Sequence, residues 1–554
     1  MNSEAATDPI TLDIIAGGLQ AAGEQMFVAL RRAAMSAIIY EVLDAGSAIT
    51  DPAGDLVSSG AGIPTFVAVL DRAVKCILAL HGREELRPGD VFLTNDPAYG
   101  GVTHLNDVVV ALPVFAGTEL VAWAANIAHW NDVGGMAPGS ISTDAIEIFQ
   151  EGLRLPAVKL IDAGRPLRSV FDILRANSRL PDFLTGDLWA GIAAARVGER
   201  RILDLVQRYG QRAVERAIDR EIATGEQLAR HRLRALPTGR FELEEEQDGG
   251  AVFTVAVEIR DAEFIVDLRT NPDQDEGPTN LSRDGATIAA QMALMNIIGL
   301  QGSANAGHLR PLTVLTRPGS VFDPTSTAAC SLYYETRIAL YDLILRCLAP
   351  HLGDRLPAGS FASICGTYIG GRHPDTGRHF TIVEPEIGGW GASQSHDGNS
   401  ALFSPVHGDT FNCPAEVAEG RYGLYVEQLA LSGACGGAGE YRGGRGITLD
   451  YRVRSDGCFL TLAYRRSEHP PWPLLGGEPG SSNYVEVLRR DGRTERYRAV
   501  TTLPLSAGDL IRIHTANGAG VGDPRRRDRA RVLEDVRNGY VSTAEAQEVY
   551  GCTL

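Results

Sequence analysis

The stretch from Thr94 to Gly135 reads TNDPAYGGVTHLNDVVVALPVFAGTELVAWAANIAHWNDVGG, and it is the most informative part of the chain. Two apolar segments stand on either side of a short Ala-Gly-Thr turn, which is the pattern of a β-hairpin. At each outer end a His stands three residues before an Asp: His104 with Asp107, and His129 with Asp132. Because a hairpin brings its outer ends together, we expect the two histidine-bearing ends to lie side by side.

Histidine and aspartate at both ends indicate a metal site. Imidazole nitrogen and carboxylate oxygen suit a borderline divalent ion such as zinc, manganese or iron, and such a site leaves coordination positions open for a substrate. The alternative is that both histidines end strands and hydrogen-bond to loop backbone, which is the commoner role of an isolated histidine.

Composition limits the class of protein. The chain has 554 residues, 44% of them hydrophobic and 22% charged, which suffices for roughly two to four globular domains. The net charge of −17 argues against nucleic acid or an anionic membrane as a partner. We expect no export and no membrane span, because neither a signal peptide nor a long apolar run is present. Dispersed cysteines without a Cys-x-x-Cys pair favour a reducing, cytoplasmic location.

Helical and strand patterns are interspersed, so we predict an α+β fold with several domains. The first domain, residues 1–237, would hold a long helix capped by Asp8, the metal-bearing hairpin and a helical extension. A strand beginning at Ile38 would carry Asp44. A central α/β domain would follow at 238–405. Residues 406–554 would form a glycine-rich β region with a terminal helix.

Glycine-rich segments are frequent in the second half, for example 433–439 and 518–522. None fits a P-loop or a dinucleotide fingerprint, so we favour turns and close packing over phosphate binding. Motifs of serine hydrolases and zincin proteases are missing as well.

Other reactive residues are isolated. Cys435 could be a nucleophile, but a cysteine without an identified basic partner is more often a packed residue. His308, His407 and His514 are interpreted as loop hydrogen-bonders. His396, next to Asp397, is the best additional acid or base among them.

Three segments in order carry a resemblance to a known family: NDPAYGGVTHLND at 95–107, AHWNDVGG at 128–135 and EGLRLP at 151–156. Further agreement lies in GGAGEYRGG at 436–444 and in GDP at 522–524. Almost end to end, the chain resembles the hydantoinase B family. That family is the metal-bearing partner subunit of 5-oxoprolinases, ATP-dependent hydantoinases and lactamases, and acetone or acetophenone carboxylases.

The resemblance implies metal ligands. In the family an early aspartate and the two His-bearing segments hold the metal, which implies Asp44, His104, Asp107 and His129 here. Glu41 and Asp132 also match family positions. Either could instead orient a metal ligand by hydrogen-bonding to it, without touching the metal.

The chain departs from the oxoprolinase pattern at two positions. Trp130 stands where those members carry a second His, and Thr65-Phe66 replaces a His-containing segment after Ile63-Pro64. Both differences speak against oxoproline itself and favour a bulkier, less polar substrate, unless Trp130 only packs.

The resemblance also implies a reaction. Family members use ATP to phosphorylate a carbonyl or enol oxygen on a partner subunit, and this chain has no recognisable ATP site. We therefore expect a hetero-oligomer in which a hydantoinase A type subunit binds ATP with Mg. This chain would complete hydrolysis of a small cyclic amide at its metal, with Asp132 or His396 moving the proton. A ketone carboxylase subunit and a non-catalytic scaffold with a structural metal are the alternatives.

Overall fold

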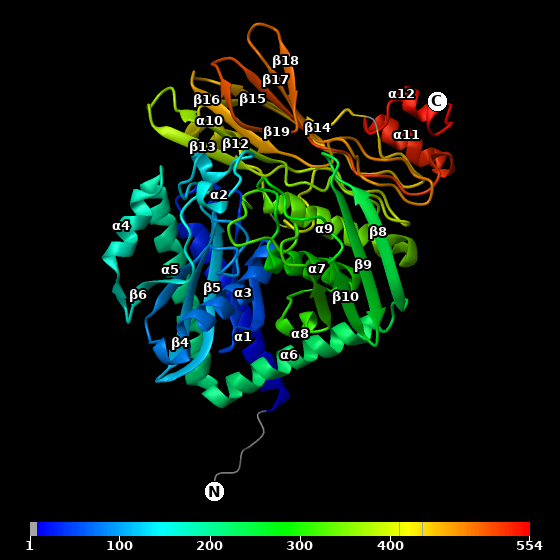
Figure 1. Cartoon of the computed structure of the whole chain (residues 1–554). Helices are drawn as coiled ribbons and strands as arrows, with labels where there is room; N and C mark the ends of the chain where they lie inside the picture. The colour runs from blue at the N-terminus through cyan, green and yellow to red at the C-terminus, as the bar shows by residue number, and fades with distance from the viewer. Residues whose placement is uncertain (1–7, 301, 409, 435, 554) are drawn as a thin grey trace.

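The structure is a computed structural model that describes residues 8–300, 302–408, 410–434 and 436–553. The described residues form helices and four β-sheets, so the predicted α+β class is confirmed (Figure 1). Among the described helices, none is both long and apolar enough to cross a membrane. Cys435, considered above as a nucleophile, lies outside the described residues.

The first sheet has seven strands in the order β2-β1-β5-β4-β3-β6-β7. These are β1 (Ala45–Thr50), β2 (Leu56–Gly62), β3 (Val91–Thr94), β4 (Asp107–Ala116), β5 (Glu119–His129), β6 (Val158–Asp162) and β7 (Arg165–Pro166). The hairpin predicted from the apolar pattern is β4 and β5, and its antiparallel register pairs Asp107 with His129. The two outer ends of the hairpin are therefore adjacent, as expected.

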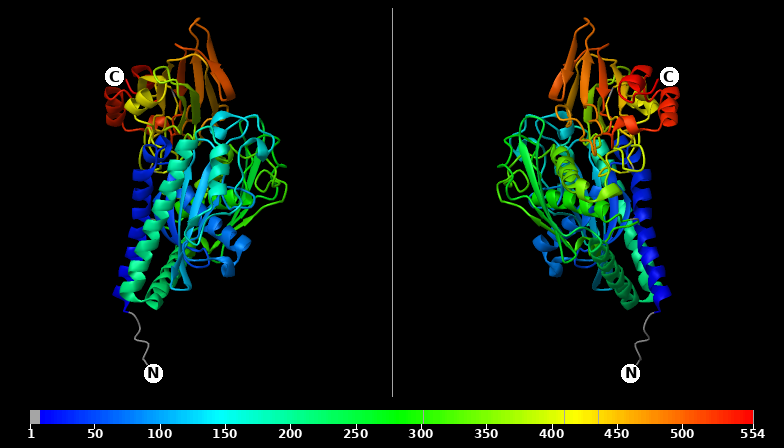
Figure 2. Two further views of the ribbon diagram at one scale, coloured as in Figure 1. Left: turned by 90° about the vertical axis from the view of Figure 1, so that its left-hand side faces the viewer. Right: turned by 90° about the vertical axis from the view of Figure 1, so that its right-hand side faces the viewer.

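Helices cover both faces of this sheet. Figure 2 shows the long helices α1 (Pro9–Ala33) and α5 (Pro181–Tyr209) side by side along one flank, with α6 (Gln211–Leu233) following. The helix α3 (Pro64–His81) packs against β1 and β5 and belongs to a separate buried cluster. Asp8 caps α1 by accepting hydrogen bonds from the backbone N–H groups of residues 10 and 11, as predicted.

One local prediction was wrong. The segment beginning at Ile38 is not a strand; residues 37–40 form the short helix α2 (Ala37–Tyr40), and β1 begins only at Ala45. Leu43 has a positive φ of 67°, which turns the chain between helix and strand. Asp44 thus stands in the turn immediately before the strand.

The second sheet, β11-β10-β9-β8, lies beside two buried helices. It consists of β8 (Gly239–Glu246), β9 (Val252–Arg260), β10 (Glu263–Asp267) and β11 (Leu312–Leu315), and the helices are α7 (Arg283–Ile297) and α9 (Tyr333–Leu348), with the short α8 (Ala306–Leu309) nearby. All but one residue of α9 are buried, so this helix runs through the core.

Two further sheets form the part that lies at the top in Figure 1. One is β13-β12-β16-β19, with β12 (Gly366–Arg372), β13 (His379–Glu384), β16 (Cys458–Ala463) and β19 (Ala499–Leu505). The other is β14-β15-β20-β17-β18, with β14 (Leu424–Leu431), β15 (Ile447–Val453), β17 (Tyr484–Leu488), β18 (Thr494–Tyr497) and β20 (Leu510–His514). The helices here are α10 (Ala415–Arg421), α11 (Arg529–Arg537) and α12 (Thr543–Glu548).

The sheet β13-β12-β16-β19 bears on the predicted domain boundaries. Its strands come from both sides of residue 405, so hydrogen-bonded pairing runs across the boundary placed there. Near residue 238, by contrast, the helical segment gives way to β8. The division into three domains stays a prediction.

The glycine-rich loops are packed closely against one another. A Cβ atom on Gly443 would stand 1.9 Å from the carbonyl oxygen of Gly518, and one on Gly444 would stand 1.8 Å from that of Asn399. Only glycine permits such backbone contacts, which agrees with the packing role favoured from the sequence.

Candidate metal centre

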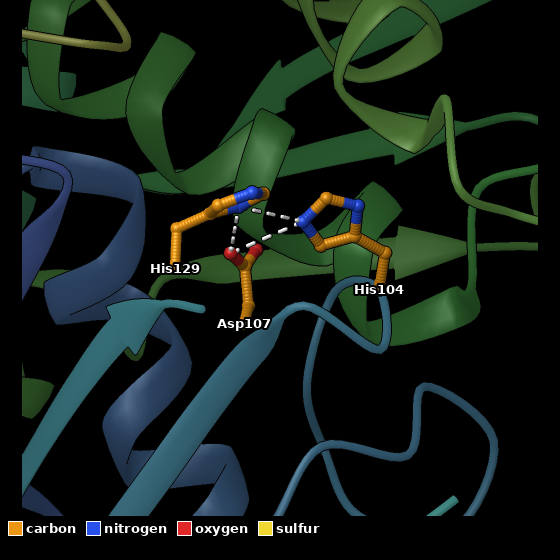
Figure 3. A group of neighbouring side chains, drawn as sticks. All are labelled: His104, Asp107 and His129. Atoms are coloured by element: carbon orange, nitrogen blue, oxygen red, sulfur yellow. Dashed lines mark hydrogen bonds and ion pairs between the residues drawn. The ribbon is translucent and has the colours of Figure 1, made fainter. Parts of the chain in front are cut away.

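Three buried side chains converge where the hairpin ends. His104 lies in the loop before β4, Asp107 is the first residue of β4 and His129 is the last residue of β5. Asp107 Oδ1 is 3.1 Å from His104 Nε2 and 3.2 Å from His129 Nδ1, and the two nitrogens are 3.3 Å apart. Figure 3 shows both rings pointing at the carboxylate. The structure thus brings together three of the four predicted ligands.

These separations fit a shared divalent ion. Ligand atoms about 2.1 Å from an ion stand roughly 3.0 to 3.4 Å apart in octahedral or tetrahedral arrangements. Each of the three residues offers one ligand atom within 4.8 Å of the others. The donor set, two imidazoles and one carboxylate, suits zinc, manganese or iron.

Neighbouring groups hold the three ligand atoms in place. Asp107 Oδ2 accepts hydrogen bonds from Thr103 Oγ1 at 2.5 Å and from Tyr333 Oη at 2.9 Å. His104 Nδ1 lies 2.9 Å from the carbonyl oxygen of Ser331, so Nδ1 carries the proton and Nε2 keeps its lone pair. Such supporting hydrogen bonds are typical of metal ligands.

The protonation states of Asp107 and His129 favour metal binding. Burial by itself would raise the pKa of Asp107, but the charge and hydrogen bond of His104 hold that pKa well below its ordinary value. Burial lowers the pKa of His129. Burial also lowers the pKa of His104, but the carboxylate of Asp107 outweighs this and raises it. An ionised Asp107 and a neutral His129 are the forms that a metal ion requires, whereas the raised pKa of His104 means that a metal ion would have to displace a proton from it.

Asp44 faces the same small cavity. The cavity measures about 30 Å³ and is lined by His104, Asp107 and His129 together with Asp44. Oδ1 of Asp44 and Nε2 of His129 are buried without a hydrogen-bond partner among the described residues. Burial, followed by the negative charge of Asp107, raises the pKa of Asp44 well above its usual value. A cation in the cavity would remove the second of these effects and satisfy the oxygen.

The two predicted proton carriers lie elsewhere. The carboxylate of Asp132 accepts hydrogen bonds from the backbone of Gly134 and Gly139 and from the backbone and side chain of Arg179. His396 is exposed, and its Nδ1 contacts the hydroxyls of Ser393 and Ser395. Neither residue lines the cavity, so their contacts favour roles in loop structure.

Three other sequence features are resolved by their surroundings. Glu41 lines a separate cavity of about 1020 Å³ near the end of α1. Trp130 is buried in the main hydrophobic core and does not line the small cavity, so it packs. Thr65 Oγ1 donates to the carbonyl oxygen of Val406.

Sequence reasoning missed several residues that line the cavity. Tyr333 and Arg337 come from α9, His407 from a loop, and Glu384 from the end of β13. His407, interpreted above as a loop hydrogen-bonder, has no hydrogen-bond partner on either ring nitrogen among the described residues. The spacing of Tyr333 and Arg337 by four residues on one helix was the only local signal available.

These features define a class: an α+β chain with a buried His-Asp-His centre at the mouth of a β-hairpin. The family described as hydantoinase B/oxoprolinase matches residues 8–524, so the chain belongs to this family.

Individual relatives and solved structures agree with this family assignment. The β subunit of caprolactamase from Pseudomonas jessenii is 31% identical over 571 residues, covering 99% of this chain and 96% of the relative. The crystal structure of ATP-dependent caprolactamase from that organism has a TM-score of 0.91 at 29% identity, covering 99% of this chain and 97% of the other. The nucleotide-free structure of acetone carboxylase has a TM-score of 0.90 at 19% identity over 98% of this chain and 79% of the other, which shows a shared fold. In 5-oxoprolinase 1 of Arabidopsis thaliana, 26% identity extends over 94% of this chain but 42% of the relative.

Proposed function

We propose that this chain is the metal-dependent subunit of a heteromeric, ATP-dependent hydrolase of cyclic amides. The observation that carries the proposal is the buried triad of His104, Asp107 and His129, whose three ligand atoms stand 3.1 to 3.3 Å apart. Membership of a family that includes a caprolactamase subunit supports the reaction class.

The name of the caprolactamase relative, a β subunit, supports a second subunit. The match covers only 42% of the Arabidopsis 5-oxoprolinase, so in that longer relative the region similar to this chain is part of a larger polypeptide. We infer that a separate hydantoinase A type subunit supplies that part, binds ATP with Mg and phosphorylates the carbonyl oxygen of the substrate.

In the proposed mechanism His104 Nε2, His129 Nδ1 and Asp107 Oδ1 would hold the metal ion, and Asp44 would complete the set of ligands. When bound, such an ion polarises a carbonyl or phosphoryl oxygen and lowers the pKa of a coordinated water. Tyr333 and Thr103 orient the carboxylate of Asp107 by donating to its second oxygen. Ser331 fixes the tautomer of His104.

Carboxylation of a ketone is the second candidate function. The fold shared with acetone carboxylase favours it, since the same scaffold can host either chemistry. In that case the cavity would accept carbon dioxide or a carboxylated intermediate in place of an attacking water.

Metal analysis of the full-length chain tests the proposal. We expect near-stoichiometric zinc, manganese or iron in the wild type and its loss in the double variant His104→Ala, His129→Ala. His396→Ala is the matched control, because this exposed histidine lies outside the cavity and its variant should keep the metal.

Activity with the partner separates catalysis from scaffolding. A complex with the double variant should assemble and turn over ATP but form little product. If it forms product at the wild-type rate, catalysis at this metal is excluded. If it fails to assemble while the wild type does, the structural role of the metal gains support.

A further inference from the structure

Arg337 is a buried cation that lines the cavity of the candidate metal centre. Its exposed fraction is 1%, and among the described residues it makes no hydrogen bond or ion pair. Its guanidinium carbon lies 5.3 Å from the centre of the Tyr333 ring, and its Nε is buried without a hydrogen-bond acceptor among the described residues. Burying an unpaired charge is strongly unfavourable, so the group calls for an anionic partner.

Arg466 shows what a buried arginine usually does in this chain. Its exposed fraction is 7%, and it forms ion pairs with Glu245, at 2.9 Å, and with Asp342. Arg337 differs in that no carboxylate among the described residues forms a direct ion pair with it, although the charge of Arg337 acts on Asp44 and Glu335 nearby.

His407 is a second group on the same cavity whose ring nitrogens have no hydrogen-bond partner among the described residues. Its exposed fraction is 6%. A neutral imidazole offers one donor and one acceptor, so a bound molecule could satisfy it. Arg337 and His407 line the cavity together with His104, Asp107 and His129.

Charge in the cavity favours an anion. With a divalent ion bound, the carboxylates of Asp44 and Asp107 balance its two positive charges and leave the charge of Arg337. Glu384, which also lines the cavity, does not offset it at neutral pH, because burial raises its pKa to about 8. Its protonated carboxyl can donate a hydrogen bond.

We propose that Arg337 and His407 form an oxyanion-binding subsite beside the metal centre, which takes a phosphate or carboxylate group of the substrate or intermediate. A guanidinium presents parallel N–H donors that match two oxygens of either group. The identity of that molecule rests on the proposed function, whereas the subsite rests on the two unpartnered side chains.

The size of the cavity limits which anion can bind without a change in the structure. Its volume of about 30 Å³ is close to that of one water molecule. A whole phosphate or bicarbonate ion is larger than this volume, so its binding requires part of the wall to move.

Isothermal titration of the metal-loaded, full-length chain with inorganic phosphate, and separately with bicarbonate, tests the subsite. We expect one anion per chain, and Arg337→Met should weaken its binding about 10- to 100-fold. His407→Gln should weaken it by less, because a neutral hydrogen bond is lost. Phosphate binding would indicate a phosphorylated substrate, and bicarbonate binding a carboxylation partner.

Two control variants separate loss of the subsite from a general effect of charge or stability. Arg168→Met removes an exposed arginine, with a side chain 92% exposed, and should leave anion binding unchanged. In anion-free buffer Arg337→Met should not lower the melting temperature, because removing an unpaired buried charge offsets the loss of its contact with the Tyr333 ring, whereas Arg466→Met should lower it by breaking two ion pairs.

Three results would overturn the subsite: no binding of either anion, equal binding by Arg337→Met and wild type, or a melting temperature of Arg337→Met as low as that of Arg466→Met. Metal content is measured in parallel. A wild-type chain without metal would contradict the proposed function, and the Arg337→Met comparison on that same chain would still decide the subsite.

Discussion

Two segments of this chain look alike in sequence but differ in place. HLND at 104–107 and HWND at 129–132 share the same spacing of His, Asn and Asp. Both histidines reach the centre, but only Asp107 joins them, while Asp132 binds loop backbone and Arg179. Equal spacing therefore does not imply equal roles.

Strand register explains the difference. Asp107 begins β4 directly opposite His129, so the carboxylate of the first segment meets the imidazole of the second. Asp132 comes after the end of β5, where the chain leaves the sheet and its N–H groups need acceptors. The first aspartate thus serves the site and the second shapes the loop.

The largest expected effect comes from exchanging each aspartate for asparagine. Asp107→Asn should weaken metal binding by about 100-fold or more, because it removes an anionic ligand. Asp132→Asn should keep the metal but lower the free energy of unfolding by about 1–3 kcal/mol, because N–H donors lose their acceptor. Metal analysis and thermal unfolding of both variants test this. If both variants lost the metal equally, the two aspartates would have the same role and the comparison of the two segments would be wrong.

The support of the first segment should depend on pH. Glu151 accepts hydrogen bonds from the N–H groups of Cys330 and Ser331, and Ser331 in turn orients His104. Burial raises the pKa of Glu151 to about 7 from an ordinary 4.5. Between these values the folded chain binds more protons than the unfolded chain, so stability falls as pH rises.

The loss across that window should be at most roughly 3 kcal/mol. Glu151→Gln keeps one acceptor and removes the titration, so denaturant unfolding from pH 4.5 to 8 should show a flatter profile than the wild type. A variant profile as steep as the wild type would place the pH dependence elsewhere.

The smallest effect concerns the two asparagines. Asn106 Nδ2 donates to the carbonyl oxygens of Trp130, at 2.8 Å, and Gly139, at 3.1 Å. Asn131 Oδ1 is buried without a partner among the described residues. Asn106→Ala should lower the free energy of unfolding by about 1–3 kcal/mol, and Asn131→Ala by less than about 1 kcal/mol. Urea unfolding of both variants measures the difference, and a larger loss for Asn131→Ala would contradict it.

Local patterns predicted much of the fold. The hairpin and the first helix with its Asp8 cap lie where periodicity placed them. The strand expected from Ile38 failed because four residues form a helical turn before Leu43 reverses the chain. A short apolar run does not distinguish these outcomes.

The candidate site was predictable only in part. His104, Asp107 and His129 lie close in sequence and on one hairpin, so alternation and spacing were enough to join them. Asp44 could be predicted as a metal ligand only from the family resemblance. Arg337 and His407 are more than 200 residues away from the hairpin, and no spacing in the sequence, not even that of Tyr333 and Arg337 on one helix, relates them to it, so they could not be found in advance.

The sequence by itself determined the hairpin, its paired histidines and the family, because these depend on residue order over short distances. The tertiary structure alone decided that Asp107 and not Asp132 joins the histidines, and that Arg337 lines the same cavity without a direct ion pair among the described residues. The physical reason is that strand register and helix packing select which distant side chains share a cavity, and only that shared cavity shows which polar groups remain unsatisfied.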